Sequence, residues 1–123
     1  MNNKIKILYV DDEPINLKLL ELNLKKHYQI LTALNGPAGL ETLAKNPDTS
    51  VVISDLKMPE MNGIEFIKRA KYRYAHMKFY ILTGFDVSDE IQQAIDSHMI
   101  LQYFQKPFDI PSIQKAINES IEN

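Results

Sequence analysis

The chain has 123 residues, and its 14 Lys and Arg residues against 16 Asp and Glu residues give a formal net charge of −2. This length predicts one domain with a core that needs no cross-links, and the absence of cysteine excludes disulfides and thiolate metal sites. The slightly acidic balance argues against direct nucleic-acid binding, which usually requires a strongly basic face.

The N-terminal segment has the features of neither an export signal nor a membrane anchor. Residues 5–10 form an apolar run that leads directly into acidic residues, and this run is too short for a signal peptide and lacks a cleavage site. No apolar stretch approaches the length of a membrane span. We therefore expect a cytoplasmic protein without membrane contact, folded as one domain over residues 1–123.

The first part of the chain predicts a strand, a helix and a second strand. The apolar run over residues 5–10 fits a strand that is buried on both faces. The segment 14–27 has helical periodicity and begins with a proline, which suits the first position of a helix. Residues 29–33 form a weaker strand candidate. The helix residues expected to face the sheet are Leu17, Leu20 and Leu24, with Leu19 and Leu22 widening the apolar arc.

The middle of the chain continues the alternation with a helix, a strand and a second helix. A helix is predicted over residues 37–45 and ends before Pro47. The apolar run 51–53 predicts a buried strand that stops just before Ser54 and Asp55. The next predicted helix covers residues 64–74 and buries Ile64, Phe66 and Ile67.

The last part of the chain adds two strands and two helices. A strand is predicted over residues 79–82, and a helix over 87–97 with Asp86 as its cap and Asp89 in its first turn. A weaker strand candidate and a final helix follow. They cover residues 101–104 and 110–121, with Asp109 as the helix cap and Ile113, Ala116 and Ile117 facing inward.

This alternation of five strands and five helices predicts an α/β fold with a doubly wound parallel sheet and right-handed crossovers. In such sheets, ligands bind beyond the carboxyl ends of the strands. The groups at these ends therefore carry most of the functional information. They are Asp11, Asp12 and Glu13 after the first strand, Asp55 after the third, Thr83 and Gly84 after the fourth, and Lys106 and Pro107 after the fifth.

The three aspartates in this set predict a cation site. If the first and third strands are neighbours, Asp11, Asp12 and Asp55 converge, and each like-charge pair costs about 4 kcal/mol at an intermediate effective dielectric. All the ligating atoms are oxygens, which favours a hard ion such as Mg²⁺. With Lys106 nearby, the set suits phosphoryl transfer to an aspartate nucleophile. Taken singly, each group also has a simpler explanation, such as a helix cap, a loop residue, a strand end or a surface lysine.

Four segments together resemble the receiver domain of two-component response regulators. They are Val10 to Pro14, Ser54 to Gly63, Leu82 to Gly84, and Tyr103 to Phe108. The resemblance covers essentially the whole chain with the motifs in their expected order. It implies a flavodoxin-like fold with five parallel strands in the order 2-1-3-4-5 and five helices.

The resemblance also implies a role for each site residue. Asp55 would be the phosphoacceptor, with Asp12 ligating Mg²⁺ (or Mn²⁺) directly and Asp11 acting largely through water. The backbone carbonyl of Lys57 would complete the metal ligands supplied by the chain. Phosphoryl oxygens would be bound by Thr83 and Lys106, and Tyr103 would be the switch aromatic that turns inward with Thr83. The peptide bond before Pro107 is expected to be cis.

The implied partners are proteins. A sensor histidine kinase or a histidine phosphotransfer protein would supply the phosphoryl group, and an unidentified downstream target or output domain would receive the signal. A homodimer formed on phosphorylation is compatible with the resemblance. The domain would not be an enzyme in the usual sense, because it would promote only its own phosphorylation and dephosphorylation.

One departure and three rival interpretations accompany the resemblance. Receivers usually carry a small Gly-Ala pair before the switch aromatic, whereas this chain has Met99 and Ile100, so we expect a bulkier exit from the fourth helix.

A haloacid-dehalogenase-type phosphatase would need a second aspartate two residues after its nucleophile, and Asp11 and Asp12 are adjacent. A flavodoxin or nucleotide-binding module would need a Gly-rich phosphate loop, which is missing here. A degenerate receiver that only binds proteins is disfavoured by the full set of acidic and basic groups.

Overall fold

The computed structural model describes residues 4–84, 88–107 and 109–122. Within these ranges the chain forms one parallel sheet, as the alternation of elements predicts, in the strand order β2-β1-β3-β4-β5 that the family resemblance implies. The elements in chain order are β1 (Ile5–Val10), α1 (Pro14–Leu24), β2 (Tyr28–Ala33), α2 (Gly36–Lys45), β3 (Val51–Asp55), α3 (Gly63–Arg73), β4 (Lys78–Thr83), α4 (Asp89–Asp96), β5 (Gln102–Gln105) and α5 (Ile110–Glu122).

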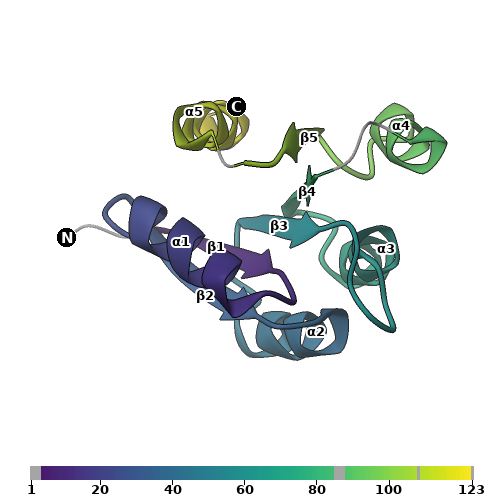
Figure 1. The fold of residues 1–123 in the computed structure, drawn as a ribbon, viewed down its shortest axis with the longest axis horizontal. Coiled ribbons are helices and arrows are strands. Elements are labelled where there is room, and N and C mark those ends of the chain that lie inside the picture. Colours follow the sequence, from purple (N-terminus) through teal and green to yellow (C-terminus); the bar gives the residue numbers. More distant parts are fainter. Residues whose placement is uncertain (1–3, 85–87, 108, 123) are drawn as a thin grey trace.

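The sheet lies between two layers of helices (Figure 1), with α1 and α5 on one face and α2, α3 and α4 on the other. The central strands are continuously apolar because both of their faces are covered. Successive residues of β1 point to opposite faces, so Ile7 and Tyr9 pack toward α1 and α5, whereas Leu8 and Val10 pack toward the other layer. None of the helices in the described part of the chain has the length and apolar character needed to span a bilayer.

Helix α1 is shorter and less covered than the sequence predicts. It ends at Leu24 rather than near residue 27. Leu17, Leu20 and Leu24 are buried as expected, but Leu19 and Leu22 remain 45% and 47% exposed. At about 100° per residue these two side chains lie on the side of the helix opposite the buried stripe. The expectation that they widen the covered arc was therefore wrong.

The ends of α4 differ in detail from the prediction. Ser88 caps the helix by accepting a hydrogen bond from the backbone N–H of Ile91 at 3.2 Å. The predicted cap, Asp86, lies outside the described residues. After the helix, His98 adopts a left-handed conformation with φ of 63°, and its backbone carbonyl accepts a hydrogen bond from Lys71 of α3. The chain thus leaves α4 without a glycine and buries Ile100 behind it.

The remaining local predictions are largely confirmed. Asp109 immediately precedes α5, its backbone carbonyl accepts from Ile113 N–H at 3.1 Å, and its carboxylate accepts from the Ser112 hydroxyl at 2.6 Å. The three α5 residues expected to face inward, Ile113, Ala116 and Ile117, are buried. The bond between Lys106 and Pro107 is cis.

Gly63 starts α3 directly against β3. A Cβ atom at this position would lie 2.3 Å from the backbone oxygen of Asp55. This approach is closer than any Cβ contact allows, and the obstacle is backbone, which cannot rotate away. The sequence alone does not show this steric requirement.

We expect Gly63→Ala to lower the free energy of unfolding by about 1–3 kcal/mol, because the methyl group would push α3 away from β3. Urea unfolding followed by circular dichroism measures the change. Gly84→Ala is the matched control, since its Cβ would come no closer than 4.0 Å to Lys106. Equal stability of the two variants would contradict the steric argument.

Candidate functional site

Three carboxylates meet at the carboxyl edge of the sheet. Asp11 and Asp12 follow β1, and Asp55 ends β3, which pairs with β1 through Val10 and Ser54. One oxygen from each aspartate lies within 4.8 Å of the others. Asp11 is fully buried, Asp55 is 6% exposed and Asp12 is exposed. The convergence predicted from the strand ends is therefore present.

Lys106 brings a positive charge into this cluster. Its Nζ lies 3.2 Å from Asp55 Oδ1 and 3.5 Å from Asp11 Oδ2. The backbone holds the lysine in place, because Lys106 N–H donates to the carbonyl of Thr83 at 2.8 Å directly after β5. The ammonium group thus bridges the two buried carboxylates.

Asp11 has further partners that the sequence interpretation did not identify. The hydroxyl of Tyr9 donates to Asp11 Oδ2 at 2.5 Å, and Asn16 Nδ2 donates to the same oxygen at 3.2 Å. The backbone N–H of Glu13 donates to Asp11 Oδ1 at 3.0 Å. The sequence does contain a signal for Tyr9, since residues two apart in a strand share a face.

Burial and charge set the protonation of the site. Burial, with a contribution from the neighbouring Asp11 carboxylate, raises the pKa of Asp55 to about 6, and Lys106 partly offsets this rise. Burial lowers the pKa of Lys106, but the carboxylates of Asp55 and Asp11 outweigh this effect and leave its pKa raised, so it stays cationic. Burial, followed by the hydrogen bond to Asp11, raises the pKa of Tyr9, which keeps its hydroxyl a donor.

The other predicted site residues lie on β4, on β5 and in the segment that follows β3. Thr83 is buried at the end of β4, next to the strand that carries Asp55. Lys57 is exposed in the segment that follows β3. Tyr103 lies in β5 opposite Ile81 and packs, partly buried, against the core on the side of α3 and α4.

The donor set fits a hard divalent cation. All side-chain ligands that the cluster offers are carboxylate oxygens, and three negative charges face one ammonium group. Mg²⁺ prefers oxygen ligands and is usually held by one or two carboxylates together with water. The exposed position of Asp12 gives such an ion access from solvent.

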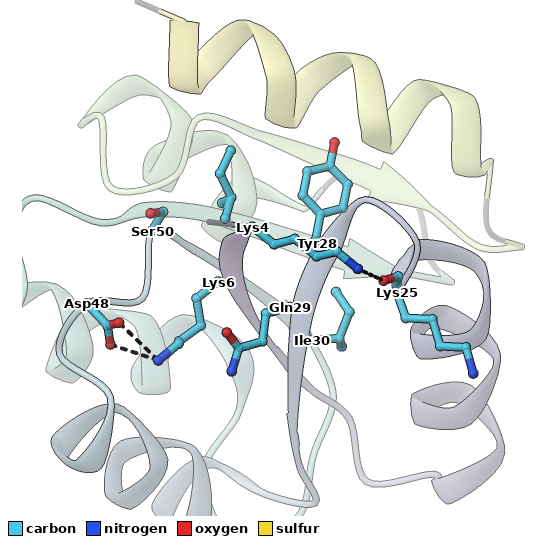
Figure 2. A pocket seen from close by; sticks show the side chains of 9 residues that line it. Lys4, Lys6, Lys25, Tyr28, Gln29, Ile30, Asp48 and Ser50 are labelled. Atoms are coloured by element: carbon cyan, nitrogen blue, oxygen red, sulfur yellow. Dashed lines mark hydrogen bonds and ion pairs between the residues drawn. The ribbon is translucent and has the colours of Figure 1, made fainter. Parts of the chain in front are cut away.

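A surface pocket of about 780 Å³ lies at the opposite edge of the sheet (Figure 2) and is lined by residues from the starts of β1 and β2. Two of the three lysines that line it have partners. Lys6 pairs with Asp48 at 3.0 Å, and Lys4 donates to the backbone carbonyl of Lys25 at 3.0 Å. The pocket shares no lining residue with the acidic cluster or with Lys106.

Comparison with known families agrees with this geometry. The sequence model of the response regulator receiver domain matches residues 7–118. The chain belongs to the response regulator receiver domain family. As a receiver domain of two-component systems, it shares with its family the flavodoxin-like fold described above.

Curated relatives and solved structures are similar along nearly the whole receiver domain. Sporulation initiation phosphotransferase F of Bacillus subtilis is 38% identical over 116 residues, which cover 93% of this chain and 91% of the relative. A CheY homologue of Campylobacter jejuni, a chemotaxis protein, is 32% identical, with 95% and 92% of the two chains covered. A receiver domain protein from Clostridium thermocellum has a TM-score of 0.89 and 32% identity, over 96% of this chain and 94% of that one. The chain spans only 26% of some other relatives.

The raised pKa of Asp55 predicts that its charge destabilises the folded receiver domain. Between its ordinary value of 3.8 and about 6, the folded protein binds more protons at this group than the unfolded chain does. The free energy of unfolding therefore falls as the pH rises through this window. In metal-free buffer, Asp55→Asn should raise this free energy at pH 7.5 by at most about 3 kcal/mol, with a smaller gain near pH 4.

Urea unfolding at the two pH values measures this effect. Asp96→Asn, which changes an exposed carboxylate of α4, is the control and should alter stability little at either pH. A gain for Asp55→Asn that is equal at both pH values would show that ionisation of Asp55 is not its source.

Proposed function

We propose that this receiver domain accepts a phosphoryl group on Asp55 in a reaction that depends on a divalent cation. The donor is the phosphohistidine of a sensor histidine kinase or of a histidine phosphotransfer protein. The observation that carries the proposal is the cluster of Asp11, Asp12 and Asp55, with Lys106 bridging two of its members. The phosphorylated domain then signals to a downstream protein target or output domain.

Asp55 supplies the nucleophile. One of its carboxylate oxygens attacks phosphorus, a P–O bond forms, and the P–N bond to the donor imidazole breaks. With a pKa of about 6, Asp55 is mostly ionised at neutral pH and so is ready to attack. Lys106 neutralises negative charge on the transferred group, and the Thr83 hydroxyl binds another of its oxygens.

Mg²⁺, or Mn²⁺ in its place, would neutralise phosphoryl oxygens when bound. The residues that would hold it are Asp12 and Asp55 directly, Asp11 largely through water, and Lys57 through its backbone carbonyl. Asp11 is buried and hydrogen-bonded, whereas Asp12 is exposed, and this difference supports direct ligation by Asp12 and ligation through water by Asp11. The assignment of these ligands follows the family resemblance, and the all-oxygen donor set supports it.

Phosphorylation would act as a switch through charge. It adds roughly 1.5 to 2 negative charges at the carboxyl edge, by analogy with other phosphorylated side chains. Thr83 and Lys106 move toward the new oxygens, and Tyr103 turns inward from its partly buried position on β5. Conversion from mostly inactive to mostly active requires about 5.5 kcal/mol of differential interaction, to which a charge-assisted bond, a hydroxyl bond and the metal contribute together.

The wider assignment is that residues 1–123 form one receiver domain that works in the cytoplasm as a phosphoacceptor. It promotes only its own phosphorylation and dephosphorylation, binds no nucleic acid directly, and homodimerises, if at all, in response to phosphorylation. A haloacid-dehalogenase-type phosphatase fits less well, because its nucleophile would follow the first strand. Here Asp11 occupies that place and is enclosed by Tyr9, Asn16 and Lys106.

Incubation with acetyl phosphate and Mg²⁺ should produce a labile adduct of one phosphoryl group, detected by intact-mass spectrometry. Asp55→Ala should lack the adduct because the nucleophile is gone, and a chelator should suppress it in the parent protein. Asp48→Ala, which removes an exposed aspartate at the opposite edge, should be phosphorylated normally. An unchanged mass of the parent protein, with donor and metal both present, would count against the proposal.

Mg²⁺ should stabilise the folded protein, because the ion relieves repulsion that only the folded state contains. At a free concentration ten times Kd, the gain is about 1.4 kcal/mol. Thermal unfolding with and without MgCl₂ measures it, with NaCl at matched ionic strength as the control. Asp12→Asn should lose most of this gain while unfolding like the parent protein in metal-free buffer, since Asp12 is exposed. An equal gain in the variant would remove Asp12 from the ligand set.

A further inference from the structure

We propose that Tyr9 is a positioning residue that directs Lys106 toward Asp55 by occupying the Asp11 carboxylate. This inference rests on the proposed function of Asp55 as the phosphoacceptor. It assigns a role to a buried strand residue that the sequence presents only as part of an apolar run.

The position of Tyr9 is fixed by the strand. Tyr9 projects from β1 to the side of the sheet that α1 and α5 cover, and Asp11, which directly follows the strand, meets its hydroxyl there. The Tyr9 side chain is fully buried, and its hydroxyl reaches Asp11 Oδ2 at 2.5 Å. This distance is at the short end of the range for O–H···O⁻ hydrogen bonds, which are among the stronger ones in proteins.

The hydrogen-bonding capacity of Asp11 explains how Tyr9 affects Lys106. A carboxylate oxygen offers about two lone-pair directions. Those of Asp11 Oδ2 are taken by the Tyr9 hydroxyl at 2.5 Å and by Asn16 Nδ2 at 3.2 Å. Lys106 Nζ is left at 3.5 Å from this oxygen, a longer contact than the 3.2 Å that separates it from Asp55 Oδ1. The ammonium group therefore favours the acceptor aspartate.

Removing the Tyr9 hydroxyl would reverse this preference. Tyr9→Phe leaves a buried carboxylate oxygen with one donor fewer, and buried acceptors without donors are costly. Lys106 Nζ already lies 3.5 Å from this oxygen, so it should move toward Asp11 and away from Asp55. The transferred phosphoryl group would then lose part of the charge neutralisation that the lysine provides.

The alternative is that Tyr9 is only a core residue whose hydroxyl needs a partner. Tyr80 provides a matched control for this explanation. It is also a buried tyrosine of a central strand and packs in the same core, but its hydroxyl donates to the backbone carbonyl of Ala116 at 3.3 Å. Tyr80→Phe therefore removes a buried hydroxyl from the same layer without touching the acidic cluster.

The first test compares rates of phosphorylation from acetyl phosphate at saturating Mg²⁺, followed by intact mass. Tyr9→Phe should lower the maximal rate roughly three- to tenfold, the scale of one perturbed hydrogen bond, without raising the half-saturating Mg²⁺ concentration. Tyr80→Phe should keep the rate of the parent protein. In a Lys106→Met background, which reacts slowly, Tyr9→Phe should have no further effect, because the residue through which it acts is gone.

The second test needs neither metal nor phosphodonor. Urea unfolding of the parent protein, Tyr9→Phe, Lys106→Met and the double variant in metal-free buffer forms a double-mutant cycle. Lys106→Met should be more destabilising in the Tyr9→Phe background, where the lysine has become a main partner of Asp11. Additive effects would overturn the inference, as would a rate of Tyr9→Phe equal to that of the parent protein.

Asn16→Ala keeps the inference testable if Tyr9→Phe does not fold. This variant removes the second hydrogen-bond donor to Asp11 Oδ2. Asn16 is half-buried at the start of α1, so its truncation leaves the core intact. It should slow phosphorylation in the same Lys106-dependent way, and an unchanged rate would contradict the inference. No adduct on the parent protein would overturn the proposed function and this inference with it. An adduct on the parent protein with unaffected Tyr9 and Asn16 variants would overturn this inference alone.

Discussion

The repulsion between two buried carboxylates, Asp11 and Asp55, is the interaction on which the rest of the site depends. At about 4 Å and an intermediate dielectric, such a pair costs about 4 kcal/mol. The protein offsets this cost with one ammonium group, a tyrosine hydroxyl, a carboxamide and a backbone N–H around the pair. Burial and, as a smaller effect, the Asp11 carboxylate still raise the pKa of Asp55, and Lys106 offsets this rise only in part. The site is therefore under electrostatic tension in its resting state, and a cation or a phosphoryl group changes the balance.

The parallel sheet makes this crowding unavoidable. β1 and β3 are direct neighbours in the strand order, so the residues that follow them must meet. β4 and β5 lie next along the same sheet and bring Thr83 and Lys106 to the same edge. Asp55 lies within β3, and Asp11 directly follows β1 with its N–H donating to the carbonyl of Ala33 at 3.1 Å, so the backbone of both buried carboxylates is held against the sheet. Such support keeps the groups in place while charge changes around them.

Much of this arrangement could be predicted from the sequence, because strand ends are marked by a change from apolar to polar residues. Asp11, Asp55 and Lys106 each follow such an end, and their contact follows from the topology. Leu19 and Leu22 were misjudged because apolar composition does not reveal which side of a helix faces solvent. Gly63 was missed because its requirement arises from a backbone oxygen of another element. Tyr9 was missed because its hydroxyl lies within an apolar run, although its spacing of two residues from Asp11 indicated a shared face.

Tyr9 and Asp11 must point to the same face of the sheet, and this requirement limits where residues can be inserted in the chain. A single residue inserted within β1 or β3 would turn every later side chain of that strand to the opposite face. Asp11 or Asp55 would then point toward α3 instead of toward its present neighbours. The connection between α2 and β3, residues 46–50, lies at the other edge and can lengthen without moving any charged group of the acidic cluster. This connection is therefore a place where a change of length is compatible with the chemistry of the site.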